Sequence, residues 1–183
     1  MLPRIVSARD IENGSGGKIL SADPRLELLL DGATAAVRRH CGWHIAPEIT
    51  ETRVFDGKGG RFLRLPTLRC VRVDSLKIQG EEVPALQFGV SPLGLIELYG
   101  REFPDRYSAV EVEFTHGYES APDVGQVIQQ VVANAFVSPM GVTREQAGQL
   151  AVTWSMTAPG VSGGISLLKR DRDILAGYRL EGA

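Results

Sequence analysis

The sequence lacks most of what a membrane or secreted protein needs. It has only two cysteines in 183 residues, Cys41 and Cys70, too few for the disulfide framework of a small secreted domain. No apolar run approaches the roughly 18 residues of a membrane span, and residues 1–6 do not begin the apolar core of a signal peptide. We therefore expect a soluble protein, made or assembled inside a cell, whose two thiols are buried small hydrophobic residues. A disulfide between them is the alternative.

An excess of basic charge is missing as well. Twenty lysines and arginines face 22 aspartates and glutamates, which gives a net charge of −2 and argues against a dedicated nucleic-acid-binding module. Arginine nevertheless outnumbers lysine sixteen to four. Four arginines share one stretch of chain with acidic residues, a mixture that favours a subunit interface: Arg61, Arg64, Arg69 and Arg72.

Two segments have the apolar period of a helix. Helix 23–41 begins with Asp23 as N-cap and Pro24 at its first position. Helix 121–138 begins after Ser120, its expected N-cap, and Asp123 stands three residues on, as in a capping box. Each helix has one apolar stripe, formed in the first by Leu26, Leu29, Leu30, Ala33, Val37 and Cys41, and in the second by Val124, Val127, Ile128, Val131, Val132, Ala135 and Phe136.

Between the two helices, residues 46–117 change to a period of two, which predicts an antiparallel β subdomain. The glycine-rich turn 56–60 predicts a hairpin between strands at 49–55 and 61–65. Further strands are expected at 71–78, with a bulge near Asp74 and Ser75, and at 95–99. The last expected strand directs three side chains into the core: Val110, Val112 and Phe114.

These elements predict an α+β fold with three parts. Residues 1–22 hold few apolar side chains and are expected to form an N-terminal arm, followed by a core over 23–139. The pattern of residues 140–183 predicts a C-terminal strand, a glycine hinge and a helix, which together favour a docking arm. A helix that only covers the sheet fits the same pattern.

Several motifs suggest catalysis without the context that it requires. Residues 160–164 spell G-x-S-x-G, but the histidine that would serve Ser162 must follow it, and all three histidines precede it. His40, Cys41 and His44 resemble half of a zinc site whose second pair is missing.

Two further motifs have simpler explanations. The tract 14–18 lacks two required residues of a phosphate loop. Residues 115–118 fit a strand-to-helix turn in which Gly117 takes a positive φ. We therefore predict no catalytic residue, no metal and no cofactor, and favour a structural role.

Longer strings of residues carry a family resemblance. The segments 23–26, 33–36, 41–47, 114–118 and 159–164 are similar to head-to-tail adaptor (connector) proteins of long-tailed, siphovirus-type phages, and most similar to those of actinobacterial phages. Shorter matches lie at 50–52, 65–68, 121–123 and 152–155. The likeness extends from about residue 23 to residue 180, while residues 81–107 carry little of it.

The resemblance implies a structural virion protein that is not an enzyme. Family members form a ring of about twelve copies between the portal protein and the stopper or tail-completion protein, and genomic DNA passes through the channel without specific binding. Such a protein belongs to the virion neck, is assembled in the bacterial host cytoplasm and needs no membrane. A small serine hydrolase using Ser162 and a nucleic-acid-binding accessory protein are the alternatives.

Within this interpretation, the C-terminal arm would contact the portal or a neighbouring subunit. Large apolar side chains dominate the energetics of such contacts. For Trp154, an ordinary core position is the alternative. The predicted interface residues are Leu150, Val152, Trp154, Met156, Leu167, Leu168, Arg170 and Ile174.

Overall fold

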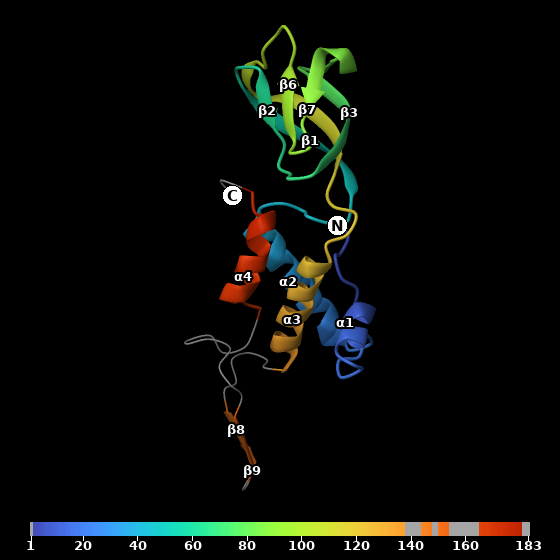
Figure 1. The fold of residues 1–183 in the computed structure, drawn as a ribbon, viewed down its shortest axis with the longest axis vertical. Helices are drawn as coiled ribbons and strands as arrows, with labels where there is room; N and C mark the ends of the chain where they lie inside the picture. The colour runs from blue at the N-terminus through green and yellow to red at the C-terminus, as the bar shows by residue number, and fades with distance from the viewer. Residues whose placement is uncertain (1, 138–143, 148–149, 154–164, 181–183) are drawn as a thin grey trace. The chain divides into compact units, whose positions relative to one another are not determined.

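The chain divides into a helical unit and a β unit. The computed structural model describes residues 2–137, 144–147, 150–153 and 165–180. The helical unit is built mainly from Met1–Cys41 and Ala121–Arg179, and the β unit mainly from Gly42–Ser120 (Figure 1). The result is a mixed α+β fold, which confirms the predicted fold class.

The helical unit is centred on two packed helices, α2 (Pro24–Cys41) and α3 (Pro122–Val137). Two short helices, α1 (Ala8–Gly14) and α4 (Lys169–Leu175), each contact both of them and lie on opposite sides of the pair (Figure 1). A 3₁₀ turn, η3 (Ala176–Tyr178), follows α4. Strands β8 (Arg144–Ala147) and β9 (Leu150–Thr153) pair with each other in a two-stranded antiparallel sheet. Within the described ranges, no helix has both the length and the apolar character needed to cross a bilayer.

The predicted apolar stripes form the core of the helical unit. Helix α2 begins at Pro24, as predicted, because proline fits the first helical position. The start of α3 differs from the expected capping box: the helix begins at Pro122, so the N-cap position falls to Ala121 and not to Ser120. The buried stripe residues are Leu26, Leu30, Ala33, Val37 and Cys41 of α2 and Val124, Val127, Ile128, Val131, Val132 and Ala135 of α3.

The first 22 residues are more structured than the sequence indicates. Ser7 and Asp10 form a capping box that begins α1. Three apolar side chains of this segment are buried, Val6, Ile11 and Ile19. They are too widely spaced to give a helical period, which is why the segment resembles a loose arm in sequence.

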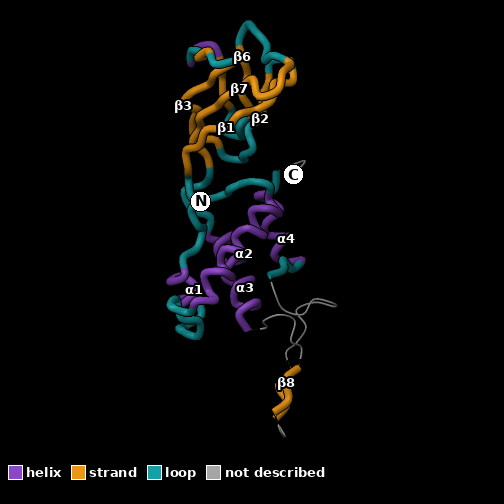
Figure 2. Tube along the Cα trace, turned by 180° about the vertical axis from the view of Figure 1, so that it is seen from behind, coloured by secondary structure: helices purple, strands orange, loops and turns teal. Residues whose placement is uncertain are grey.

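The β unit contains two antiparallel sheets (Figure 2). The larger has the order β1-β7-β3-β4 and the smaller the order β2-β6-β5. The strands are β1 (Ile49–Lys58), β2 (Phe62–Arg64), β3 (Cys70–Ile78), β4 (Glu81–Glu82), β5 (Phe88–Val90), β6 (Leu95–Leu98) and β7 (Asp105–His116), with a 3₁₀ turn, η1 (Ala85–Gln87), before β5.

The strand pairing corrects one prediction and confirms another. β1 and β2 do not form the expected hairpin, because β1 pairs with β7 and β2 pairs with β6. The predicted bulge in β3 is present: Val73 pairs with Phe114 and Ser75 with Glu113, so Asp74 is the extra residue.

Both sheets contribute side chains to one hydrophobic core. Val110, Val112 and Phe114 of β7 are fully buried, as predicted, together with Leu76 of β3 and Ile96 of β6. Both cysteines of the chain are free and buried, Cys70 in the β unit and Cys41 in the helical unit. This confirms their interpretation as small hydrophobic residues.

Candidate functional site

The structure places the predicted interface residues in different environments. Leu167 and Leu168 are half-buried, whereas Ile174 is 46% exposed and the side chain of Arg170 is 61% exposed. Leu150 and Val152 belong to β9. Trp154 and Met156 lie outside the described residues. Arg170 and Ile174 are therefore the two whose side chains are on the surface of α4.

Helix α4 is anchored to its own helical unit. Leu175 is fully buried, and its carbonyl oxygen lies 3.9 Å from Cys41 Sγ, which donates a weak hydrogen bond. Asp171 is also buried, and its Oδ2 accepts a 2.9 Å hydrogen bond from the backbone N–H of Leu168 at the helix start. After the helix, Tyr178 Oη donates to both carboxylate oxygens of Asp123 at 2.9 Å. These contacts fix α4 against α2 and α3 of the same chain.

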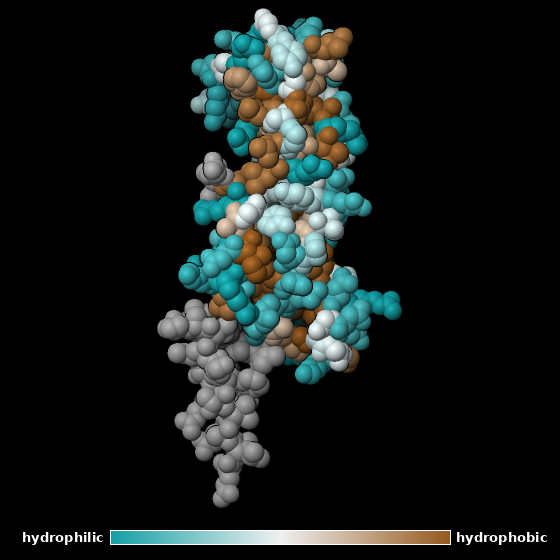
Figure 3. Space-filling model, in the orientation of Figure 1, coloured by the Kyte–Doolittle hydropathy of each residue, from teal (hydrophilic) through white to brown (hydrophobic). Residues whose placement is uncertain are grey.

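A cleft with mixed chemistry lies between α3 and α4. Its volume is about 210 Å³, and α3 supplies two amide side chains and one apolar one. α4 supplies a guanidinium, a buried carboxylate and an apolar wall. Figure 3 shows apolar surface on this part of the helical unit, next to α4. The lining residues are Gln126, Val127, Gln130, Arg170, Asp171 and Ile174.

A second cavity lies on the other side of α3. It has a volume of about 310 Å³ and is closed by α1 and the segment after it, including Ile11 and Ile19. Gln126 and Gln130 line this cavity as well as the cleft. The glutamines on α3 therefore lie between the two openings, the cavity bordered by α1 and the cleft bordered by α4.

The ends of α2 and α4 bring positive charge together. Burial, and then the nearby guanidinium groups of Arg179 and Arg172, lower the pKa of His40 below its ordinary value of 6.5. Burial also raises the pKa of the neighbouring Cys41 thiol to about 11, so this thiol is unreactive at neutral pH.

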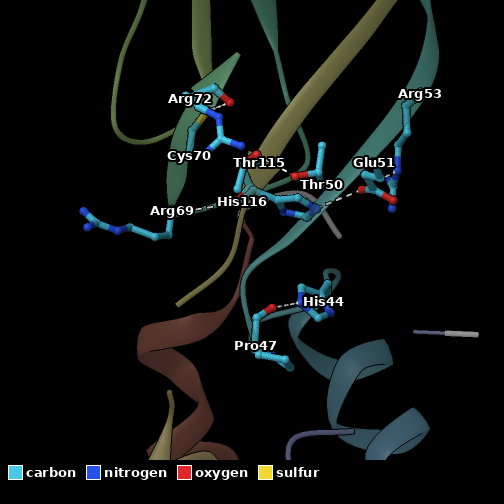
Figure 4. Close-up of polar contacts among 11 residues, drawn as sticks. His44, Pro47, Thr50, Glu51, Arg53, Arg69, Cys70, Arg72, Thr115 and His116 are labelled. Carbon is cyan, nitrogen blue, oxygen red and sulfur yellow. Dashed lines mark hydrogen bonds and ion pairs between the residues drawn. The ribbon is translucent and has the colours of Figure 1, made fainter. Parts of the chain in front are cut away.

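The β unit holds a buried histidine at the end of β7 (Figure 4). His116 Nε2 lies 2.9 Å from Glu51 Oε1 on β1, and the same oxygen lies 2.8 Å from Arg53 Nε. The His116 ring packs against Phe114 at 4.7 Å and against His44 at 5.6 Å between ring centroids. Its Nδ1 has no hydrogen-bond partner among the described residues.

A polar chain crosses the adjoining strands. Thr50 Oγ1 lies 2.7 Å from Thr115 Oγ1, which in turn lies 3.1 Å from Asp74 Oδ2. Asp74 is the bulged residue, and its other oxygen accepts a 2.6 Å bond from Arg72 Nε. The bulge therefore directs a carboxylate toward the β7 hydroxyl. The nearby turn has the expected conformation, because Gly117 has a φ of 109°.

Burial determines the charge state of His116. Desolvation lowers its pKa below 6.5 despite the opposing effect of Glu51, so the imidazole is neutral at pH 7 and donates from Nε2 to the carboxylate. The Thr50 and Thr115 hydroxyls are bonded to each other and to Asp74. His116 thus takes part in a packed, hydrogen-bonded cluster and not in a relay with a nucleophile.

The lowered pKa of His116 predicts that acid destabilises the β unit. Below about pH 6.5 the unfolded chain takes up a proton at this histidine more readily than the folded chain, so the free energy of unfolding falls by at most about 1.4 kcal/mol per pH unit. In a Trp154→Phe background, urea unfolding followed by Trp43 fluorescence at about pH 7.5 and about pH 5.5 measures this loss. His116→Gln should reduce it. An NMR titration of His116 with a midpoint above 6.5 would contradict the prediction.

Comparison with solved structures identifies the fold. No family model and no curated protein sequence matches the chain. The structure is similar to a chain in the neck of an empty gene transfer agent particle, computed with C6 symmetry, at a TM-score of 0.62 and 16% identity, covering 100% of this chain and 95% of the other. This chain shares the fold of that neck chain.

Two further solved structures share this fold. One is the neck of a native gene transfer agent particle, computed with C12 symmetry, with a TM-score of 0.57, 16% identity and coverage of 100% and 98% of the two chains. The other is the virion of a native gene transfer agent particle, with a TM-score of 0.61, 17% identity and coverage of 98% and 93%. The similarity therefore includes both units.

The structure describes some of the motifs that suggested catalysis. His40 and Cys41 belong to the helical unit and His44 to the β unit. The described part of the chain contains no group of three or more potential metal ligands. Ser162 lies outside the described residues. The glycine tract after α1 is a turn in which Gly16 and Gly17 have positive φ.

The sequence analysis missed the cleft and the buried histidine cluster. Asp171 and Leu175 are one turn apart and form the buried side of α4. Because Asp171 is charged, it interrupts the apolar period by which a buried helix face is recognised in a sequence. Glu51 and His116 are 65 residues apart, and no local pattern joins them. The arginine-rich stretch is mixed in charge, as expected: Arg61 pairs with Glu97 at 2.7 Å and Arg72 with Asp74 at 2.6 Å.

Proposed function

We propose that the protein is a head-to-tail adaptor of a phage or phage-like particle. It is a structural subunit that forms a ring of about twelve copies in the virion neck, between the portal protein and the stopper or tail-completion protein. The observation that carries this proposal is the similarity of the fold, over nearly the whole chain, to neck structures computed with sixfold and twelvefold symmetry. The sequence resemblance to adaptors of long-tailed phages, actinobacterial ones above all, supports it independently.

In this role the protein is not an enzyme, needs no cofactor and works by forming contacts. It is assembled in the bacterial host cytoplasm, and genomic DNA passes through the ring without specific binding. A net charge of −2 supports this part of the proposal, because a protein without a basic excess does not hold DNA phosphates tightly. Closed rings of this kind are built from heterologous contacts, in which two different surfaces of one subunit meet.

We further propose that different segments of the chain have different roles in the ring. The core over residues 23–139 forms the body of the ring subunit. Residues 1–22 act as a first arm that is packed on this core through Val6, Ile11 and Ile19, and residues 140–183 act as a second arm. The burial of Leu175 limits how the second arm can move, since α4 is held by its own helical unit. The eight predicted interface residues, Leu150 to Ile174, would then contact the portal or a neighbouring subunit from an arm that is fixed at both ends.

Native mass spectrometry combined with negative-stain imaging tests the ring directly. Purified protein across a concentration series should give closed rings of about twelve subunits with a central hole. The second part of the test is mixing with a phage portal protein, because such a subunit can require a template for assembly. A strict monomer that also fails to bind the portal protein would overturn the proposal.

A further inference from the structure

The α3–α4 cleft has the size and chemistry of a socket for one large side chain. Its volume of about 210 Å³ is below the roughly 300 Å³ at which pockets for drug-sized ligands begin. Val127 and Ile174 give it apolar walls, and the amides of Gln126 and Gln130 give it hydrogen-bond acceptors. The exposed guanidinium of Arg170 is at its edge.

These features match the needs of a tryptophan. A buried indole requires apolar walls and an acceptor for its N–H, and an arginine at the rim can stack on its face. The chain supplies such a side chain in residues 150–156, where Leu150, Val152, Trp154 and Met156 alternate with small or polar residues. In a β-strand, such alternation would place the four large side chains on one face.

The same segment needs a partner for a structural reason. Within the described residues, β8 and β9 form a two-stranded sheet, and each strand is four residues long. A two-stranded hairpin is at best marginally stable alone in water and gains stability by packing against something else. Each chain therefore has one segment that needs a partner and one socket, which is the pairing that a heterologous ring contact requires.

We propose that the cleft between α3 and α4 binds residues 150–156 of a neighbouring copy of the chain, with Trp154 as the anchor. The proposal rests on the proposed ring and specifies its contact. α4 is fixed in its own subunit through Leu175 and presents Arg170 and Ile174 to the incoming segment. The subunits are thus joined in one direction around the ring.

Disulfide trapping tests the contact in the full-length protein. Ser155→Cys, next to the anchor, is combined with Gln130→Cys in the cleft, and the assembled protein is oxidised. The two native thiols interfere little, because both are buried and burial raises the pKa of both. The matched control combines Ser155→Cys with Ala35→Cys, an exposed position on α2.

We expect a ladder of covalent multimers from the cleft pair and none from the control pair. A monomer with an internal disulfide would overturn the proposal in favour of docking within one chain. Equal ladders from both pairs, or no cross-link in protein that native mass spectrometry shows to be ring-shaped, would overturn it while leaving the proposed function intact. Failure to form rings with or without the portal protein would overturn both.

Charge placed on the cleft wall gives a second readout. Ile174→Glu should weaken assembly roughly 30-fold, because a hot-spot contact contributes about 2 kcal/mol. Leu28→Glu is the control, since Leu28 is an apolar side chain of α2 that is 77% exposed and lies outside the cleft. An equal effect of the two variants at unchanged thermal stability would overturn the assignment of the cleft.

Discussion

Leu175→Ala is expected to lower the free energy of unfolding of the helical unit by about 2–5 kcal/mol, the range observed when a buried leucine is truncated in a core. Leu175 is fully buried and is the last residue of α4, where its carbonyl oxygen contacts Cys41 of α2. Loss of its side chain leaves a cavity at the junction of α4 and α2. Chemical denaturation followed by far-UV circular dichroism measures the change.

The adjacent residue provides the control for this prediction. Ile174 lies on the same helix but is 46% exposed, so Ile174→Ala should change stability by less than about 1 kcal/mol. If the proposed ring contact is right, the two variants separate stability from assembly: the first destabilises the fold, and the second weakens assembly. Equal destabilisation by both would contradict the anchoring of α4 through Leu175.

Phe114→Ala is expected to destabilise the β unit by about 3–5 kcal/mol. Phe114 is the largest fully buried side chain of β7, where it pairs with Glu51 of β1 on one side and Val73 of β3 on the other. Its ring also packs against His116. Urea unfolding followed by Trp43 fluorescence in a Trp154→Phe background reports on this unit, because Trp43 lies 6.3 Å from the His116 ring between centroids.

Val54→Ala is the matched control for the core variant. Val54 is on β1 of the same sheet but is 56% exposed, so its truncation should cost less than about 1 kcal/mol. The far-UV signal of the helical unit gives a further check. A Phe114→Ala protein whose Trp43 transition is unchanged would refute the central position of β7 in the β-unit core.

Local sequence patterns predicted the elements whose structure depends on residues close together in the chain. The α2 stripe from Leu26 to Cys41, the inward alternation of β7 and the positive φ of Gly117 depend on residues close together in the chain, and all three are confirmed. The bulge at Asp74 belongs to the same class, because a slip of phase in one strand is visible without knowing its partner.

Contacts between distant segments could not be predicted in the same way. The turn at 56–60 has hairpin chemistry, yet β1 pairs with β7 across about 60 residues, and alternation alone does not select a partner. The burial of Asp171 in α4 is similar, since a carboxylate satisfied by the Leu168 N–H looks like surface charge in the sequence. The interface residues 150–156 remain predictions, to be tested by the cross-linking experiment.

The pairing of β1 with β7 has a consequence for how such a protein can diversify. The chain leaves α2 at Cys41, enters the β unit through β1, and returns to α3 after β7, so Ile49 and His116 face each other across the first and last strands. When the first and last strands of an inserted segment pair with each other, the segment can be exchanged as a whole. The path of the chain through the helices on either side then stays the same. Residues 42–120 can therefore be replaced as one unit while the helical scaffold is kept.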